Sequence, residues 1–229
     1  MKRVLYFILA LLPVLVSCDK DKEIDDVQEL PQDGIPVAIL TDNGYYDGLI
    51  YYHVTSRYLI HQVVVSDCEN APVAVEIPAQ IKIDGTVYTC IGIDDFALTS
   101  CSAITSVTMS DSITSIGNAA FQKCSSMKSV TISENATVIG GGAFRECSSL
   151  TEVTIPASIE LIGSNAFINC TGITKVICKG STPPDVGTGI SWAFDNNTCT
   201  SATLYVPMGS KSAYQNHAKW GSFANIIEQ

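Results

Sequence analysis

Apolar and polar positions alternate in short blocks along the chain, and the blocks recur every 23 residues. In the block at 150–155, Leu150, Val153 and Ile155 are apolar and the residues between them are polar. This alternation predicts a short strand with Val153 and Ile155 on one face. Pro156 ends the strand because proline has no N–H for a ladder. Equivalent strands are expected at 104–109, 127–132 and 173–178.

Three further columns follow the same period. Their members are Val107, Val130, Val153 and Val176; Cys101, Cys124, Cys147 and Cys170; and Phe96, Phe121, Phe144 and Phe167. The phenylalanine column needs two extra residues in its first unit, between Phe96 and Cys101. A single unit cannot bury these side chains, whereas units stacked at strand spacing, about 4.8 Å, place them in continuous columns. The sequence therefore predicts a solenoid.

Residues 150–170 resemble the repeat of BspA-type leucine-rich-repeat surface proteins, L-x-x-V-x-I-P-x-S-[IV]-x-x-I-G-x-x-A-F-x-x-C. The other units depart from it in places, for example at Ser110 and Ser133, which replace the proline. The resemblance implies a β-rich right-handed solenoid of about 23-residue leucine-rich repeats. It further implies short strands, irregular or short-helical returns, and a cap at each end.

Five segments are expected along the chain. They are a signal peptide (1–17), an acidic tether (18–35), a β-rich N-terminal cap (36–90), four repeats (91–182), and a degenerate repeat with a C-terminal cap (183–229). In the first cap, strands at 73–78 and 80–83 precede an Asp84-Gly85 hairpin turn. In the second, Trp192-Ala193-Phe194 opens the degenerate unit, and 210–217 is expected to form a short helix.

The N-terminus has the pattern of a secretion signal. Lys2 and Arg3 precede an uncharged run at 4–16, which is too short for a comfortable membrane span. The run ends in Leu-Val-Ser-Cys18, which resembles the lipobox of bacterial lipoproteins. The resemblance implies that Cys18 carries the lipid and anchors the chain to the outer membrane. Residues 19–33 hold seven acidic and two basic residues, similar to surface-export signals of Bacteroidales lipoproteins, which favours an outward orientation.

The composition of the chain narrows the classes of binding partner and activity to be expected. The 13 basic and 23 acidic residues give a net charge of −10, which argues against nucleic-acid binding because phosphate contacts need clustered Lys or Arg. No zincin, hydrolase, P-loop or dinucleotide-binding motif occurs, and His53, His61 and His217 lie in no metal-binding pattern. We therefore expect neither an enzyme nor a cofactor.

The nine cysteines admit two interpretations. A secreted chain with this many favours disulfides, yet four of them share one repeat position with parallel side chains. For that column we expect buried free thiols acting as small apolar groups, and no zinc, since a linear column does not converge on a metal. The state of Cys68, Cys90, Cys178 and Cys199 stays open.

Leucine-rich-repeat proteins usually bind through the strand surface, which supplies the candidate contacts Thr108, Lys128, Thr131, Glu152, Thr154 and Lys175. Over the four repeats this surface is hydroxylated, nearly neutral and without aromatics. Further candidates are the aromatic residues Tyr45, Tyr46 and Trp192. Three functions remain: adhesion to protein partners such as host matrix proteins, as the resemblance implies; accessory glycan binding; and a passive envelope scaffold.

Overall fold

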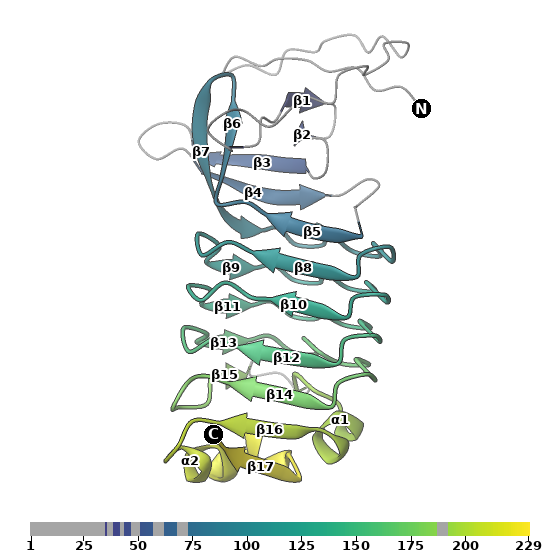
Figure 1. Cartoon of the computed structure of the whole chain (residues 1–229), viewed down its shortest axis with the longest axis vertical. Coiled ribbons are helices and arrows are strands. Elements are labelled where there is room, and N and C mark those ends of the chain that lie inside the picture. Colours follow the sequence, from purple (N-terminus) through teal and green to yellow (C-terminus); the bar gives the residue numbers. More distant parts are fainter. Residues whose placement is uncertain are drawn as a thin grey trace.

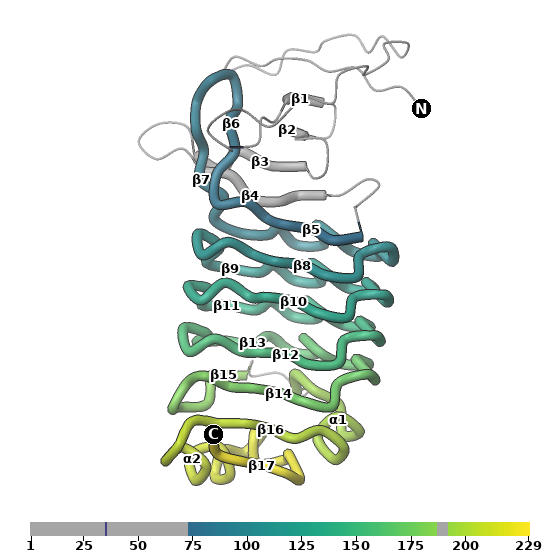
Figure 2. Tube along the Cα trace, viewed as in Figure 1, coloured from purple at the N-terminus to yellow at the C-terminus, as the bar shows by residue number. Residues whose placement is uncertain are grey.

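The computed structural model describes residues 73–186 and 192–229, Ile35, and the backbone of four strands nearer the N-terminus. Successive coils of similar shape stack along the long axis, from β5 to β17 (Figures 1 and 2). The predicted solenoid is confirmed. The expected signal peptide and acidic tether lie outside the described residues.

One side of the solenoid is built from parallel strands in two sheets. The first contains β5 (Ala74–Ile77), β8 (Ser106–Met109) and β10 (Ser129–Thr131); the second contains β12 (Glu152–Ile155), β14 (Lys175–Cys178), β16 (Thr203–Val206) and β17 (Asn225–Glu228). All four predicted repeat strands are present. The register keeps the period, since Val107 pairs with Val130 and Val153 with Val176. Within these described strands no ladder joins β10 to β12. We call the outward surface of these seven strands the strand face.

A third sheet closes another side of each coil. It runs through β7 (Thr86–Ile93), β9 (Ser115–Ile116), β11 (Val138–Ile139), β13 (Leu161–Ile162) and β15 (Asp185–Val186), all parallel. Beyond β7 it continues through β4 (Gln62–Asp67), β3 (Tyr51–Ser56), β2 (Gly44–Tyr46) and β1 (Ile39–Thr41). Unlike the sheets of the strand face, it runs without a break past the level of β10 and β12.

The N-terminal part of this sheet contains the predicted hairpin. Strand β6 (Gln80–Ile83) pairs antiparallel with β7. Asp84 and Gly85 both have positive φ, 47° and 77°, as a type I′ turn requires. Strand β5, predicted as part of the cap, pairs in parallel with β8 and so continues the strand face.

The third side carries a spine of stacked aromatic rings. Phe121, Phe144 and Phe167 are fully buried, with successive ring centroids 5.2 Å apart and ring planes nearly parallel. Phe194, which lies in the predicted degenerate unit, extends the stack at 5.0 Å. The backbone follows the same step: the Phe121 N–H donates to the Ala143 carbonyl, and the Phe144 N–H to that of Ala166.

The first member of this column was assigned wrongly. Leu98, not Phe96, occupies the spine position, because its N–H donates to the Ala120 carbonyl and its side chain is fully buried. Phe96 is 62% exposed and has φ 62°. It takes the corner position held by Ala119, Gly142 and Asn165 in later units, where φ is also positive. With Leu98 in the column, the spacing is 23 throughout and no extra residues are needed.

Glycine is required where consecutive coils approach most closely. A Cβ placed on Gly140 would lie 2.5 Å from the backbone of Gly117 in the preceding coil, and one on Gly163 would lie 2.3 Å from Gly141. Distances this short exclude a side chain unless the coils separate. The Ile-Gly pair of the repeat therefore sets the coil-to-coil contact at this corner.

The C-terminal cap closes the spine with aromatic side chains. Helices α1 (Asn196–Ser201) and α2 (Lys211–Asn216) and the 3-10 helix η1 (Trp220–Ser222) surround β16 and β17. Trp220 packs against Phe194 and donates from Nε1 to the Pro184 carbonyl at 3.0 Å. The buried Tyr214 of α2 donates to the Gly180 carbonyl at 2.9 Å. The short helix expected at 210–217 is confirmed as α2.

Candidate protein-binding surface

The strand face carries a row of outward-pointing residues, one at the third position of each of its strands. Alternation along each strand sends Val153 and Ile155 inward and Thr154 outward. Within each sheet the ladders keep the members of the row in register. From the N-terminal end the row is Glu76, Thr108, Thr131, Thr154, Ile177, Tyr205 and Ile227.

The chemistry of this row changes along the molecule. Its N-terminal members are hydroxylated or acidic, whereas Ile177 and Ile227 are large and apolar and Tyr205 presents a large aromatic ring. Ile177 and Tyr205 are partly exposed, and Ile227 is 46% exposed. We call these three residues the apolar row. The expectation of a strand face without aromatics holds only for the four repeats, because β16 adds a strand that the sequence assigned to the cap.

Charged groups flank the apolar row. The Lys175 Nζ lies 3.0 Å from the Glu152 Oε2, and both side chains are partly exposed. The same ammonium sits 5.5 Å from the centroid of the Tyr205 ring, within reach of a cation–π interaction. Lys175 therefore lies over the Tyr205 ring. An aromatic ring beside an apolar strip and charged groups is the composition typical of protein interfaces.

The predicted strand-face residues divide between the two sheets. Thr108, Lys128 and Thr131 are exposed on the N-terminal sheet. Exposed Glu152 and the partly exposed Thr154 and Lys175 lie on the C-terminal sheet, beside the apolar row. Tyr205 and Ile227 were missed. The signal was present, because Leu204 and Val206 alternate with Thr203 and Tyr205 as Val176 and Cys178 do with Lys175 and Ile177.

Trp192 is not an open aromatic platform. It is partly buried, and its indole donates from Nε1 to the Cys199 Sγ at 3.3 Å. Its ring also packs edge-to-face against Phe194 and Trp220, at 5.5 and 5.1 Å. The Trp192 side chain therefore packs among the residues of the C-terminal cap. Tyr45 and Tyr46 lie in β2, opposite Tyr52 and Tyr51 of β3 in the ladder.

The cysteine column is buried and supplies hydrogen-bond donors to neighbouring coils. Cys124, Cys147 and Cys170 are free thiols, and each Sγ lies 3.0 to 3.2 Å from a backbone carbonyl of the preceding coil. Burial raises the pKa of Cys124 and Cys170 to about 12, and it also raises the pKa of Cys147. At neutral pH these thiols are protonated, which leaves no thiolate nucleophile in the column.

Cys101 departs from this pattern, since it is disulfide-bonded. The expectation of free thiols throughout the column is therefore wrong at its first member. Of the cysteines left open, Cys178 and Cys199 are free and buried and Cys90 is buried, while Cys68 and the proposed lipidation site Cys18 lie outside the described residues.

Among the described residues, no group of three or more His, Cys, Asp or Glu side chains could hold a metal ion. In the same part of the chain, no helix is both long and apolar enough to cross a membrane.

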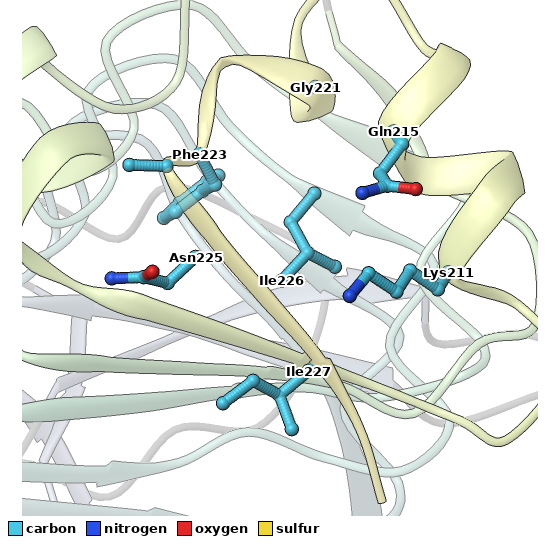
Figure 3. Close-up of a pocket in the computed structure, with 8 residues that line it drawn as sticks. Lys211, Gln215, Gly221, Phe223, Asn225, Ile226 and Ile227 are labelled. Carbon is cyan, nitrogen blue, oxygen red and sulfur yellow. The ribbon is translucent and has the colours of Figure 1, made fainter.

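A pocket of about 520 Å³ lies beside the last strand. Its lining comes from α2, η1, β17 and the two residues between η1 and β17, namely Lys211, Gln215, Gly221, Phe223, Ala224, Asn225, Ile226 and Ile227. Figure 3 shows the Lys211 and Gln215 side chains extending from α2 toward β17. Ile227 belongs both to this lining and to the apolar row, so the pocket continues the strand face around its C-terminal edge.

Comparison with known proteins places the chain in a family. The family described as BspA type leucine rich repeat region matches residues 79–216 in six copies. The chain therefore belongs to the BspA-type leucine-rich-repeat family, a family of protein-interaction or surface repeats whose members are generally non-enzymatic scaffolds. No curated protein matches the chain.

Several solved structures share the fold. A leucine-rich-repeat protein of T. pallidum is 17% identical, with a TM-score of 0.61 over 81% of this chain and 86% of that one. One from Bacteroides capillosus is 28% identical, with a TM-score of 0.54 over 61% of this chain and all of the other. A leucine-rich cell surface protein of Faecalibacterium prausnitzii is 21% identical, with a TM-score of 0.52 over 80% and 54%.

Proposed function

We propose that the chain is a non-enzymatic, lipid-anchored cell-surface protein that binds protein partners through the C-terminal half of its strand face. The observation that carries the proposal is the apolar row, with Ile177, Tyr205 and Ile227 in register on three adjacent strands. Large apolar side chains standing in line on a solvent-facing sheet mark an interaction surface. The hydroxylated residues of β8 and β10 need no such explanation, because threonine is a favourable strand residue.

Two comparisons and two features of the N-terminal sequence support the placement at the cell surface. The family is one of surface and interaction repeats, and the similar F. prausnitzii structure is described as a cell surface protein. The lipobox-like end at Cys18 would supply a lipid that holds the chain on the outer membrane. The acidic residues that follow favour an outward orientation, from which the strand face could contact host matrix proteins.

Binding is tested on an array of matrix proteins and polysaccharides. The full-length protein in detergent is applied as wild type, as Tyr205→Ala and as the matched control Thr131→Ala, which changes the same row on the N-terminal sheet. We expect retention on at least one protein, weakened about 30-fold by Tyr205→Ala, since a central aromatic contact contributes about 2 kcal/mol. Thr131→Ala should bind like wild type.

The other outcomes separate the alternatives. Retention on a polysaccharide alone would favour accessory glycan binding, and an empty array would favour a passive envelope scaffold. Equal weakening by Thr131→Ala and Tyr205→Ala would contradict the assignment to the C-terminal half.

Orientation is tested separately by protease treatment of intact cells. Wild-type protein should be degraded, whereas a periplasmic control protein should survive. Cys18→Ala, which removes the thiol that accepts the lipid, should release the protein from the membrane fraction. Survival of the wild-type protein on intact cells would contradict surface display.

A further inference from the structure

The strand face ends at β17 with an open edge. In the order β12-β14-β16-β17, β17 is the last strand, and within the described residues it pairs with β16 alone. Such an edge presents unpaired backbone donors and acceptors, which can pair with another extended chain. The open edge therefore differs from the rest of the strand face in offering backbone as well as side-chain contacts.

The register shows which residues of β17 present these groups. The Gln229 N–H donates to the Val206 carbonyl of β16 at 3.0 Å. Since successive residues of a strand direct their N–H and C=O to opposite sides, Asn225 and Ile227 also face β16. The N–H and C=O groups of Ile226 and Glu228 consequently face the open edge.

The pocket beside β17 lies along this edge. Residues 225–227 of β17, with the preceding Ala224, line one side, and Lys211 and Gln215 of α2 line another (Figure 3). The side chain of Ile226 is buried, so an incoming chain would meet the backbone at this residue. Ile227, exposed on the strand face, would lie beside one outward-facing side chain of an added strand.

The charged groups beside the edge of β17 favour one kind of extended chain. Among the described residues, the Lys211 ammonium makes no ion pair. The nearby Glu228 carboxylate is engaged, because its Oε1 accepts a hydrogen bond of 2.9 Å from the Lys211 backbone N–H. A free ammonium beside an open strand edge is complementary to a carboxylate on the incoming chain.

We propose that the edge of β17 binds an extended acidic peptide segment of a protein partner, which adds to the sheet as a further strand. Backbone hydrogen bonds form to Ile226 and Glu228, an acidic side chain meets Lys211, and an apolar side chain continues the apolar row beyond Ile227. Strand addition of this kind takes affinity from the backbone and specificity from alternate side chains. The inference rests on the proposed protein-binding function and specifies one partner chemistry for it.

The test uses three synthetic peptides with the full-length protein. The first alternates valine and threonine around a central aspartate, the second has lysine in place of the aspartate, and the third has proline at two central positions. Affinity is measured by fluorescence anisotropy. We expect binding of the aspartate peptide, at least about tenfold weaker binding of the lysine peptide, and no binding of the proline peptide, which cannot extend a ladder.

Amide hydrogen exchange followed by NMR supplies the backbone readout. In the free protein the N–H groups of Ile226 and Glu228 should exchange fast, and those of Asn225 and Ile227 slowly. The aspartate peptide should slow exchange at Ile226 and Glu228. Lys211→Glu should reverse the preference between the two charged peptides, and Lys211→Gln, which places no second carboxylate beside Glu228, should abolish it. Lys128→Glu, on the N-terminal sheet, is the matched control and should change nothing.

Two results would overturn the inference: no binding of the aspartate peptide at about 1 mM, or binding that leaves exchange at Ile226 and Glu228 unchanged. Either failure is distinguishable from failure of the proposed function. Retention on the matrix-protein array that is sensitive to Tyr205→Ala but not to Lys211→Glu would preserve the strand-face proposal and remove only the open edge.

Discussion

The inward and outward positions of the same strands follow different rules. Inward, Val107, Val130, Val153 and Val176 repeat one residue type, because each coil must match the coil beneath it. Outward, the residue between two inward positions changes from Thr131 to Ile177 and Tyr205 while the backbone register stays the same. The inward residues therefore repeat because packing between coils constrains them, whereas the outward residues are free of that constraint and differ from coil to coil. This contrast explains why the interior identified the fold and only the exterior suggests a binding surface.

The largest expected effect lies in the spine. Phe144→Ala should lower the free energy of unfolding by about 3–5 kcal/mol, because the ring is fully buried between Phe121 and Phe167. Urea denaturation followed by circular dichroism measures the change. Phe96→Ala is the control, and its cost should be within about 1 kcal/mol since this side chain is mostly exposed. Equal costs at the two positions would contradict the reassignment of the column to Leu98.

The coil-to-coil contact predicts the next effect. Gly140→Ala should destabilise the fold by about 1–3 kcal/mol, because the new Cβ meets backbone at 2.5 Å. Gly85→Ala serves as a comparison, since a Cβ there has nothing within 4 Å but sits at positive φ. Its cost should be about 1 kcal/mol, from backbone strain alone. Thermal unfolding of both variants checks the order, and a Gly140→Ala variant as stable as wild type would refute the close approach.

The thiol column predicts a pH dependence on the alkaline side. The folded-state pKa of Cys147 lies above the ordinary value of 9.0, so above pH 9 the unfolded chain releases a proton that the folded chain keeps. Stability should therefore fall as pH rises above 9, by about 1.4 kcal/mol per pH unit for each such thiol.

The Cys147→Ser variant isolates this contribution. A serine keeps a donor for the Phe121 carbonyl but does not titrate in this range. Denaturation curves between pH 8 and 10.5 should show a shallower decline for Cys147→Ser, and no difference in slope below pH 9. Identical slopes throughout would show that Cys147 does not remain protonated in the folded protein.

The smallest effect concerns the charges on the outward side. Lys175→Ala removes the pair with Glu152 and the contact with the Tyr205 ring, both partly exposed. Exposed pairs contribute little, and the free energy of unfolding should change by less than about 1 kcal/mol. If the apolar row binds protein, Lys175→Ala should change the binding free energy on the array by more than it changes the free energy of unfolding. A loss of stability above about 2 kcal/mol would instead make Lys175 part of the structural interior.

The expected caps fared differently at the two ends of the chain. The Asp84-Gly85 hairpin was predictable because its turn needs two residues with positive φ, and this pair is a well-known signal for it. The packing of the aromatic side chains in the C-terminal cap was only partly predictable. Phe194 follows the Ala-Phe pattern, but nothing local shows that Trp192 packs on Trp220 rather than facing solvent. Such contacts join residues that no short-range pattern connects.

The sequence by itself determined the repeat, the inward columns and the family, because a fixed period forces equivalent residues into equivalent places. It did not decide which residue fills the first spine position, where local likeness pointed to Phe96 and long-range pairing selected Leu98. Nor did it join Tyr205 and Ile227 to Ile177. That row exists only because β16 and β17 add to the sheet after connections that contain α1, α2 and η1, and it is tertiary pairing that places their outward side chains in line.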